Sequence, residues 1–417
     1  MTLSKRRKGL IATAALLGGS LTLAACGGGD DGSRPEPTKK VDEAAARNAS
    51  DAKIKIQPKD GSANAGINDD ARVTVTDGTL TDVKMTAADS KNAGSKKPVE
   101  GTLSADKRTW KPKERLDRST KYTVTVRAKD AQGREAVENS TFTTVSPAHS
   151  FIGTFTPEDG STVGVGMPVS LTFDKPVKNK KAVESAIKVS ADSNQKVVGH
   201  WFGDRRLDFR PQEYWKAHSK VTMSLKLDGV EASPGVKGVQ NKTVSFTVGR
   251  SQVSTVDADT HLMTVVRDGK TIKTLPISSG SEEHPTYNGQ MVISEKFRET
   301  RMDGSTVGFT RKDGKGEYDF PDVPHAMRLS TSGTFIHGNY WSKGTFGNVN
   351  TSHGCIGLRD VQGADDPSTD GAWFFENSMT GDVVRMVNSP DHTIQPDNGL
   401  NGWNMDWRQW VAGSALK

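Results

Sequence analysis

Short segments in which apolar and polar residues alternate recur along most of the chain after residue 50, with Gly, Pro, Asn and Asp between them. Alternation at every second position is the pattern of a half-buried β-strand, because successive side chains of a strand point to opposite faces of its sheet. Two examples are YTVTV at 122–126 and VTMSL at 221–225. The pattern predicts a mainly β protein whose strands are joined by tight turns.

A repeat divides the first part of this β region in two. The sequence PKDGS at 58–62 returns as PEDGS at 157–161, at an offset of 99 residues. Units of about 100 residues that hold several short alternating strands are typical of β-sandwiches. We therefore expect two tandem immunoglobulin-like sandwiches, at 51–148 and 149–250.

The tryptophans of these two units are Trp110, Trp201 and Trp215. We interpret them as core or inter-domain packing rather than as a platform for glycans, because no acidic pair, aromatic cluster or Cys/His set accompanies them in 51–248. The role of the two sandwiches is left open, and a spacer that raises the domain that follows is one interpretation.

A third domain is expected at 251–388. It opens with alternating strands at 253–257 and 262–266. Asp268 and Gly269 then form the two-residue signal of a hairpin turn that leads into a strand at 271–275. The opening of this domain is therefore predicted to be antiparallel.

Two further elements and a tail complete the chain. A short apolar segment around Phe374 and Phe375 is predicted to be helical, and residues 382–387 are predicted to be the closing strand of the third domain. The tail, 389–417, is expected to pack on that domain. Its tryptophans, Trp403, Trp407 and Trp410, have spacings of four and three, which predicts that they share one face of a helix.

Cys355 is the cysteine best placed for chemistry. It ends the sequence SHGC at 352–355, and another histidine, His337, lies 18 residues before it at the end of an apolar run. A thiol attacks a carbonyl as the thiolate, of which only a few per cent exists near neutrality at a pKa of about 8.5, so the cysteine needs an imidazole base. Main-chain N–H groups around Gly354 could hold the oxyanion of a tetrahedral intermediate. The motif predicts acyl transfer through a thioester.

Two structural interpretations compete with this chemistry. A lone cysteine is often a small buried hydrophobe, and two histidines with a cysteine could bind zinc. A structural zinc site needs a fourth ligand, however, and the region has no second cysteine and no H-x₃₋₅-H pair. We therefore expect no zinc ion held by Cys355 and these two histidines. Neither a metal nor an organic cofactor is required for acyl transfer through a thioester, because the donor bond already carries the acyl group.

The longer sequence, IHGNYW at 336–341 followed by GNVNTSHGCIGL at 347–358, resembles the L,D-transpeptidase catalytic domain of the YkuD type. The signature of that family is a histidine, a gap in the mid-teens and then Ser/Thr-His-Gly-Cys. TYNG at 286–289 and MDGST at 302–306 are similar to substrate-flap segments of its actinobacterial lipoprotein branch, which carries immunoglobulin-like domains. The resemblance covers about 251–388 and implies a β-rich catalytic domain there, followed by the short tryptophan-rich tail.

The resemblance implies an enzyme that forms 3→3 cross-links between peptidoglycan stem peptides. Cys355 would attack the third residue of a donor tetrapeptide and release D-Ala, and an amine of an acceptor stem would resolve the thioester. His337 would be the general base and acid, while His353 and Gly354 would shape the oxyanion hole. The candidate substrate contacts are Tyr318, Met302, Trp341, Asn350 and Ser352. β-Lactams of the carbapenem type would be inhibitors.

Two departures from the family pattern leave alternatives open. Gly357 stands where many members have Arg or Asn, so a substrate contact from that side chain is absent. Gly338 stands where the mycobacterial branch often has Ser, so the orientation of His337 would fall to a backbone carbonyl. An L,D-carboxypeptidase or a D-amino-acid exchange enzyme would use the same residues with another acceptor. A non-catalytic wall-binding adaptor also stays open.

The N-terminus predicts where the protein acts. A basic segment and an apolar stretch lead to LAAC at 23–26, which is the pattern of a lipoprotein signal peptide, with an ordinary secretory signal as the alternative. We expect residues 1–25 to be removed, Cys26 to carry the lipid, and the polar residues 26–50 to form a flexible tether. The protein would then be anchored on the outer face of the cell membrane, facing the wall, and Cys355 would have no disulfide partner.

The overall charge adds little. Lys and Arg number 56 against 50 Asp and Glu, which gives a net charge of +6. Four of the positive charges lie at 5–8, in the segment expected to be removed. No nucleic-acid recognition motif is found, so nucleic acid is not an expected partner.

Overall fold

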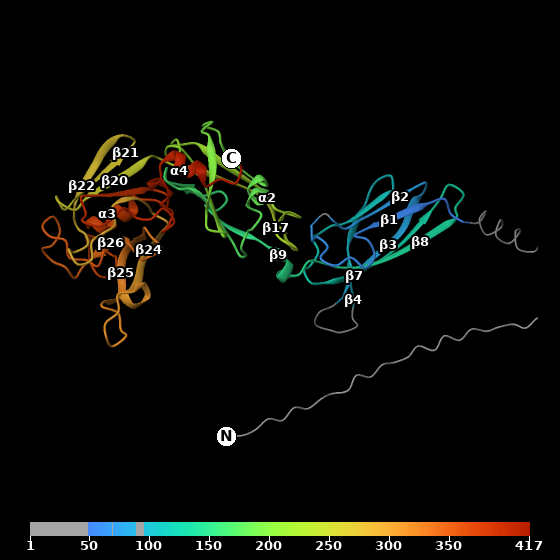
Figure 1. Ribbon diagram of the computed structural model, residues 1–417, viewed down its shortest axis with the longest axis horizontal. Helices are drawn as coiled ribbons and strands as arrows, with labels where there is room; N and C mark the ends of the chain where they lie inside the picture. Colours follow the sequence, from blue (N-terminus) through green and yellow to red (C-terminus); the bar gives the residue numbers. More distant parts are fainter. Residues whose placement is uncertain (1–48, 69, 89–95) are drawn as a thin grey trace, which may run out of the picture. The chain divides into compact units, whose positions relative to one another are not determined.

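The computed structural model describes residues 49–417, apart from residue 69 and residues 89–95 (Figure 1). The predicted signal segment, Cys26 and nearly all of the predicted tether lie outside the described residues. Within the described ranges, no helix is long and apolar enough to cross a membrane. Strands dominate the described chain and helices are few and short, so the predicted fold class is confirmed.

The first sandwich packs two four-stranded sheets against each other. Their strand orders are β1-β2-β6-β5 and β4-β3-β7-β8. The strands are β1 (Lys53–Gln57), β2 (Arg72–Thr76), β3 (Thr79–Ala88), β4 (Lys96–Val99), β5 (Gly101–Leu103), β6 (Thr109–Pro112), β7 (Lys121–Lys129) and β8 (Glu135–Thr143). Trp110, Tyr122 and Phe142 lie in one core between the sheets, so Trp110 is a core residue.

The second sandwich has the same plan. Its sheets have the orders β10-β12-β15-β14 and β11-β19-β16-β13, and a small sheet, β17-β18-β9, lies beside them. The elements are η1 (Pro147–His149), β9 (Ser150–Phe151), β10 (Gly153–Thr156), β11 (Thr162–Val163), β12 (Val169–Phe173), α2 (Lys180–Ser185), β13 (Ile187–Ala191), β14 (Val197–Phe202), β15 (Arg206–Pro211), β16 (Lys220–Lys226), β17 (Glu231–Ser233), β18 (Val236–Gly238) and β19 (Asn241–Val248). Trp201 and Trp215 are buried in its core, as predicted.

The sequence repeat is also a repeat of contacts. Asp60 accepts a hydrogen bond from the backbone N–H of Thr141 at 2.7 Å, and Asp159 accepts the equivalent bond from Ser245 at 2.8 Å. The glycines that follow these two aspartates have φ angles of 73° and 74°. Because glycine adopts this left-handed conformation without strain, the Asp-Gly pair explains why the same turn recurs in both sandwiches.

The third domain is built on one nine-stranded mixed sheet. Its order is β23-β28-β20-β21-β22-β27-β26-β25-β24. The strands are β20 (Gln252–Asp257), β21 (Leu262–Arg267), β22 (Lys270–Ser278), β23 (Gly289–Val292), β24 (Glu295–Asp303), β25 (Asp319–Arg328), β26 (Phe335–Asn339), β27 (Ile356–Arg359) and β28 (Val383–Val387). The predicted opening hairpin is confirmed as β21 and β22, with Asp268 at φ 47° and Gly269 at φ 77°, as a type I′ turn requires. The predicted closing strand is β28, which pairs in parallel with β20.

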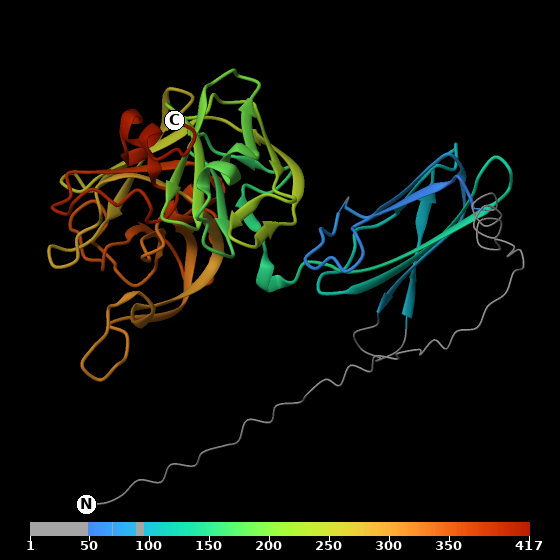
Figure 2. The same ribbon diagram turned by 45° about the vertical axis from the view of Figure 1, so that its right-hand side comes forward.

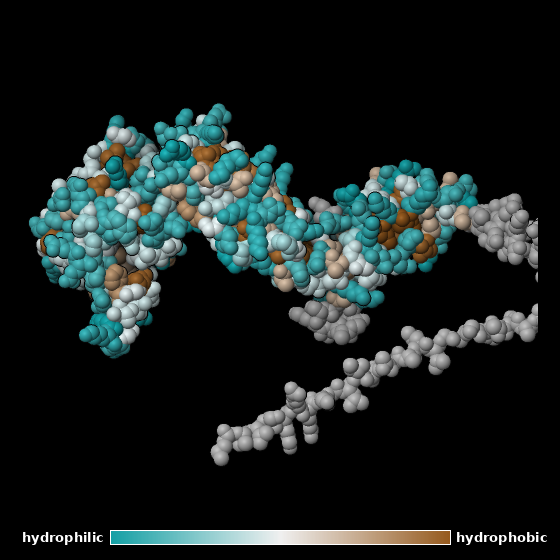
Figure 3. Space-filling model, in the orientation of Figure 1, coloured by the Kyte–Doolittle hydropathy of each residue, from teal (hydrophilic) through white to brown (hydrophobic). Residues whose placement is uncertain are grey.

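Two features of this domain position the candidate site. The short helix α3 (Asp370–Glu376), which confirms the helical prediction around Phe374, contacts β25, β26 and β27. The strands β24 and β25 continue into a long hairpin that contains η2 (Gly304–Val307) and projects from the sheet in both ribbon views (Figures 1 and 2). The surface at the tip of this hairpin is hydrophilic (Figure 3). We refer to residues 303–318 as the flap.

The prediction that three tryptophans share one helical face is wrong. Trp403 lies in a separate turn, η3 (Gly402–Asn404), and α4 (Trp407–Ala412) begins only after it, because Asp406 and Gln409 form a capping box there. The three rings instead surround the guanidinium group of Arg210, whose carbon lies 4.7, 5.6 and 4.3 Å from the ring centres of Trp403, Trp407 and Trp410. Burial lowers the pKa of Arg210 to about 10, and cation–π contacts with three rings stabilise a charge that has lost most of its water.

The tail packs on two domains rather than on the third domain alone. Asn401 and Asn404 accept hydrogen bonds from the backbone N–H groups of Val292 and Gln290 in β23, at 2.9 and 2.8 Å. The helix α4 then leaves the third domain and lies against β14 of the second sandwich (Figures 1 and 2), where Trp410 is buried. The tail therefore ties the second sandwich to the third domain.

Candidate active site

The two predicted catalytic residues lie on adjacent strands. The strands β26 and β27 pair in parallel, with His337 opposite Gly357. Cys355 lies two residues before Gly357, directly ahead of β27. Because side chains separated by two residues point to the same face of a sheet, His337 and Cys355 face the same side. The gap of 18 residues thus returns the chain to the strand next to the histidine.

The imidazole of His337 is oriented by the backbone. The side chain is buried, with 5% of its surface exposed, and its Nδ1 lies 2.7 Å from the carbonyl oxygen of Gly338. A carbonyl oxygen only accepts, so Nδ1 carries the proton and Nε2 holds the free lone pair. Burial lowers the pKa of His337, against the opposing effects of the Gly338 carbonyl and Asp360. The resting imidazole is therefore a neutral base.

Cys355 is a free, partly buried cysteine. Its Sγ lies 3.7 Å from the carbonyl oxygen of Gly333. Burial raises the pKa of the thiol to about 11, although the backbone N–H of Phe335 acts in the opposite direction. The resting residue is therefore a thiol, and it must lose its proton when it attacks.

Both residues line a pocket of about 540 Å³ beneath the flap. Met302, Tyr318, Trp341 and Ser352, four of the predicted substrate contacts, also line it. The ring of Trp341 stacks on His337, with 5.7 Å between ring centres and 19° between planes. Burial raises the pKa of Tyr318, with Cys355 as the next cause, so this phenol stays protonated as a donor. The structure thus brings these predicted residues together in one pocket.

A larger and more open cavity of about 780 Å³ lies on the first sandwich, around Asp51 and Arg108. Its lining contains no cysteine and no histidine. The smaller pocket under the flap is therefore the candidate active site, because it alone of the two combines a nucleophile with a base.

The turn that holds the nucleophile is built by Ser352 and Gly354. The hydroxyl of Ser352 donates to the carbonyl oxygen of Cys355 at 2.6 Å and accepts the N–H of Gly354 at 3.2 Å. Gly354 has a φ of 102°, a conformation that L-residues with side chains rarely adopt. An oxyanion bound at the N–H of Gly354 would have to replace Ser352 as the acceptor. Ser352 therefore shapes the turn as well as lining the pocket.

The side chain of His353 points toward the flap. Its Nε2 lies 3.3 Å from a carboxylate oxygen of Glu317, and its ring contacts Tyr318 with 5.0 Å between centres. Any contribution of this residue to an oxyanion hole would come from its backbone and from its place in the pocket lining.

Asn350 does not fit the substrate contact predicted for it. Its side-chain oxygen accepts the N–H of Ser279 at 2.9 Å and faces Nδ1 of His261 at 3.1 Å, and its amide nitrogen donates to the carbonyl oxygen of Ala258 at 2.9 Å. These bonds occupy the amide, and Asn350 is not part of the pocket lining. Its role is to anchor the loop that precedes the nucleophile.

Sequence reasoning missed two groups of residues around the site. Phe320 lies in the pocket and stacks on Trp341 at 4.0 Å between ring centres, and its position two residues after Tyr318 could have indicated a shared strand face. Behind the site, the buried Asp360 accepts from His325 at 2.7 Å and from Thr369 at 2.9 Å. His325 lies 35 residues from Asp360 and Thr369 lies nine residues from it, and no sequence motif links the three residues.

Two family models match the chain. A model described as bacterial Ig domain matches residues 62–231, and one described as L,D-transpeptidase catalytic domain matches residues 251–386. The second match contains the pocket, together with His337, His353 and Cys355.

Similar proteins cover most of the chain. L,D-transpeptidase 2 of Mycobacterium tuberculosis is 33% identical over 363 residues, which are 87% of this chain and 85% of that protein. L,D-transpeptidase 5 of Mycobacterium tuberculosis is 31% identical over 372 residues, with coverage of 87% and 77%. Among solved structures, L,D-transpeptidase 3 of Mycobacterium tuberculosis in complex with a faropenem-derived adduct is 25% identical, with a TM-score of 0.46, and the match covers 58% of this chain and 100% of that one.

Proposed function

The chain belongs to the L,D-transpeptidase family of acyltransferases, and from that premise we propose that it forms 3→3 cross-links between peptidoglycan stem peptides through a thioester on Cys355. The observation that carries this proposal is the pairing of β26 with β27, which puts His337 and Cys355 on one face of the sheet, where both line one pocket. The pocket supplies a nucleophile, a base of defined tautomer and aromatic walls. These are the groups that acyl transfer through cysteine requires.

The reaction begins from a neutral pair. Burial raises the pKa of Cys355 and lowers that of His337, so proton transfer between them in the free enzyme is unfavourable. The thiolate therefore forms as the thiol attacks, with His337 acting as general base in the same step. A neutral resting thiol is also less exposed to oxidation than a preformed thiolate.

Acylation consumes the donor stem. The Sγ of Cys355 bonds to the carbonyl carbon of the third residue, and its proton passes to Nε2 of His337. The bond from that carbon to the nitrogen of D-Ala then breaks, and His337 returns the proton to the leaving amine. The products are a thioester on Cys355 and free D-Ala.

Resolution of the thioester repeats these steps with the acceptor. A side-chain amine of the acceptor stem attacks the thioester carbon and gives its proton to Nε2 of His337. The carbon–sulfur bond breaks, and Cys355 takes the proton back as a thiol. His337 thus acts as the base in both acylation and resolution, and Cys355 carries the acyl group between the two steps.

The proposed inhibitors follow from the same thiol. A carbapenem carries a strained acyl bond, and a thiol with an adjacent base opens such a bond to give a stable thioester adduct. The protein should therefore gain the mass of one carbapenem at Cys355.

The proposed location rests on the N-terminal sequence. LAAC at 23–26 after an apolar stretch supports a lipid anchor on Cys26, facing the cell wall. Metabolic labelling with a clickable fatty acid tests the anchor. Label on the wild-type protein and none on Cys26→Ala is the expected result, and equal label on both would remove the proposal.

The proposed activity is tested by incubating residues 49–417 with a disaccharide-tetrapeptide. The products are then identified by mass spectrometry. The expected product is a dimer that has lost one D-Ala, formed by the wild type and not by Cys355→Ala. Formation of tripeptide without dimer would instead indicate that the protein is an L,D-carboxypeptidase. Unchanged substrate would indicate a non-catalytic adaptor.

A further inference from the structure

Three side chains outside the acyl-transfer pair converge at the base of the flap. His284 comes from the loop after β22, Glu317 from the end of the flap, and His353 from the turn that holds the nucleophile. The Nε2 atom of His353 lies 3.3 Å from one oxygen of Glu317, and Nε2 of His284 lies 3.9 Å from the same oxygen. One nitrogen or oxygen atom from each of the three residues lies within 4.8 Å of the others.

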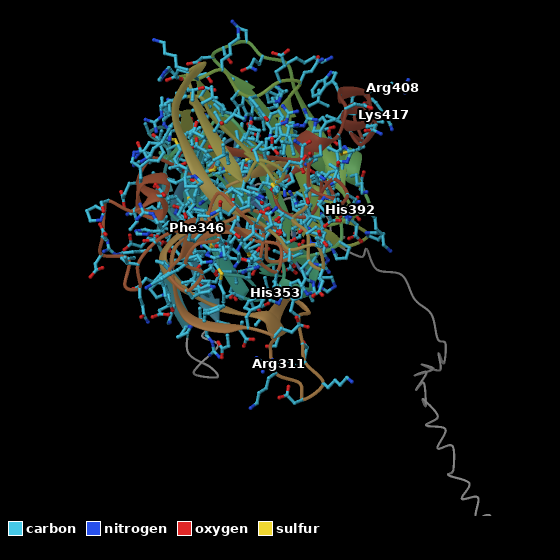
Figure 4. The ribbon with its side chains drawn as sticks, turned by 90° about the vertical axis from the view of Figure 1, so that its left-hand side faces the viewer. Arg311, Phe346, His353, His392, Arg408 and Lys417 are labelled. Carbon is cyan, nitrogen blue, oxygen red and sulfur yellow. The ribbon has the colours of Figure 1, made fainter. Side chains whose placement is uncertain are left out.

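The position of this cluster is visible from the side of the molecule. Figure 4 shows His353 at the base of the hairpin whose tip carries Arg311. The rings of His284 and His353 stack, with 4.9 Å between centres and 15° between planes, and Phe309 packs edge-on against both. Aromatic contacts thus hold both imidazoles beside the carboxylate.

The polar atoms of the cluster have few other partners. Among the residues that the structure describes, the ion pairs of Glu317 are those with His284 and His353. All three side chains are about one-third exposed, at 31%, 36% and 34% for His284, Glu317 and His353. An ion from solvent can therefore reach them.

Two imidazoles and one carboxylate are a donor set that Zn²⁺ prefers. We infer that His284, Glu317 and His353 form a zinc site, with a fourth position open to water. With bonds of about 2.0–2.2 Å in a tetrahedral arrangement, the ligand atoms of a zinc site lie roughly 3.3–3.5 Å apart. The distance from His353 to Glu317 already has this value, and binding of the ion would require the His284 ring to rotate out of its stack on His353, so that its Nε2 moves from 3.9 Å to the same range. Because the two histidines and the glutamate come from three separate segments, a zinc ion at this site would link these segments to one another.

The link that a zinc ion would make also affects access to the active site. Glu317 precedes Tyr318 on the flap, and His353 lies two residues before Cys355. Zinc bound to both would hold the flap to the turn of the nucleophile and restrict entry to the pocket that Tyr318, His353 and Cys355 line together. The ion is therefore a regulator of access, and it takes no part in the proton and acyl transfers proposed above.

Zinc binding to residues 49–417 is measured by equilibrium dialysis and titration calorimetry after treatment with a chelator. The Cys355→Ala variant is included because a cysteine is itself a zinc ligand. The expected result is about one zinc ion per chain in both the wild type and Cys355→Ala. His284→Gln removes one proposed ligand, and its loss of affinity should exceed the roughly 10–100-fold that changes outside the ligand shell cost. Binding that is lost in Cys355→Ala, or that survives in His284→Gln, overturns the site, as does the absence of binding.

The effect on access is measured by alkylation of Cys355 with iodoacetamide, which does not depend on the proposed cross-linking activity. Zinc should slow alkylation of the wild type at least about tenfold. It should leave His284→Gln unaffected, because that variant lacks one of the three zinc ligands. Without zinc, the two proteins should react at the same rate. Equal slowing of both by zinc would show that the ion acts at the thiol and not at the cluster.

Discussion

His337 donates a hydrogen bond from Nδ1 to the carbonyl oxygen of Gly338, across 2.7 Å. This contact between neighbouring residues determines which ring nitrogen is available to Cys355, since it leaves the lone pair on Nε2. No side chain is required for the orientation, which accounts for a glycine at position 338. The backbone therefore determines the tautomer of His337.

Replacement of His337 should remove the base while the site stays folded. The variant His337→Asn keeps an N–H donor near the position of Nδ1 but has no basic nitrogen, so acylation of Cys355 by a carbapenem should slow by about 10²–10⁴-fold. Time-resolved intact mass spectrometry measures that rate, and circular dichroism checks the fold. If His353→Ala abolished acylation while His337→Asn did not, the assignment of the base would be wrong.

The pH dependence of acylation should reflect a neutral resting pair. Burial lowers the pKa of His337, so the base stays unprotonated at pH values where an ordinary imidazole, with a pKa of about 6.5, is already charged. The rate should therefore fall on the acid side with a midpoint below about 6.5, and a plateau should extend toward the pKa of about 11 that burial gives Cys355. The second-order rate constant for carbapenem acylation, measured across the pH range, decides this. A fall in the rate on the alkaline side, where the imidazolium of a preformed thiolate–imidazolium pair would lose its proton, would contradict the neutral resting pair, and an acid midpoint above about 6.5 would contradict the lowered pKa of His337.

Position 338 should tolerate glycine alone. A Cβ atom there would lie 2.0 Å from a carboxylate oxygen of the buried Asp360, so Gly338→Ala should lower the free energy of unfolding by about 1–3 kcal/mol or more. Gly357, opposite His337 on β27, is a matched control, because a Cβ atom there meets its nearest neighbour, the carbonyl oxygen of Ser278, at 3.4 Å. Urea denaturation of the two variants should show a large loss for the first and a small one for the second. Equal losses would contradict the predicted clash.

The tail should contribute strongly to the stability of the second sandwich. Trp410 is fully buried against it and donates to the carbonyl oxygen of Val198 at 2.9 Å, so Trp410→Ala should cost about 3–5 kcal/mol. Trp407 lies on the same helix and also faces Arg210 but is partly exposed, so Trp407→Ala should cost clearly less. Calorimetry of residues 49–417 compares the unfolding transitions. A larger effect at Trp407 would contradict the expectation that burial of Trp410 holds the tail, since Trp410 is both the more buried ring and the one closer to Arg210.

The sequence predicted the parts of this structure that local pattern determines. Alternating residues and an Asp-Gly pair were sufficient for the hairpin of β21 and β22, and the Asp-Gly repeat was sufficient for two similar sandwiches. The pocket was also predictable in outline, since Tyr318, Met302 and Trp341 lie in it with Cys355 and His337. For these residues, the family resemblance supplied what pattern alone did not.

Two predictions failed for different physical reasons. Asn350 was predicted as a substrate contact from its closeness to the nucleophile, but its amide is occupied by Ser279 and Ala258, which lie far away in the sequence. The spacing of the tail tryptophans fits one helix, yet the capping box at Asp406 starts α4 after Trp403. Hydrogen bonds such as those of Asn350 are settled by tertiary structure, whereas the capping box of Asp406 and Gln409 is a local sequence signal that outweighs the spacing of the tryptophans.

Detection of the acyl-enzyme itself tests the thioester mechanism. Residues 49–417 are incubated with a tetrapeptide donor stem whose side-chain amine is blocked by acetylation, so that no acceptor amine is present. The protein is then quenched in acid, digested and mapped by tandem mass spectrometry. We predict a tripeptide, the donor less its D-Ala, attached to the peptide that contains Cys355, and no such adduct in Cys355→Ala. A donor that loses D-Ala without any adduct on Cys355, or an adduct on another residue, would contradict the proposed thioester mechanism.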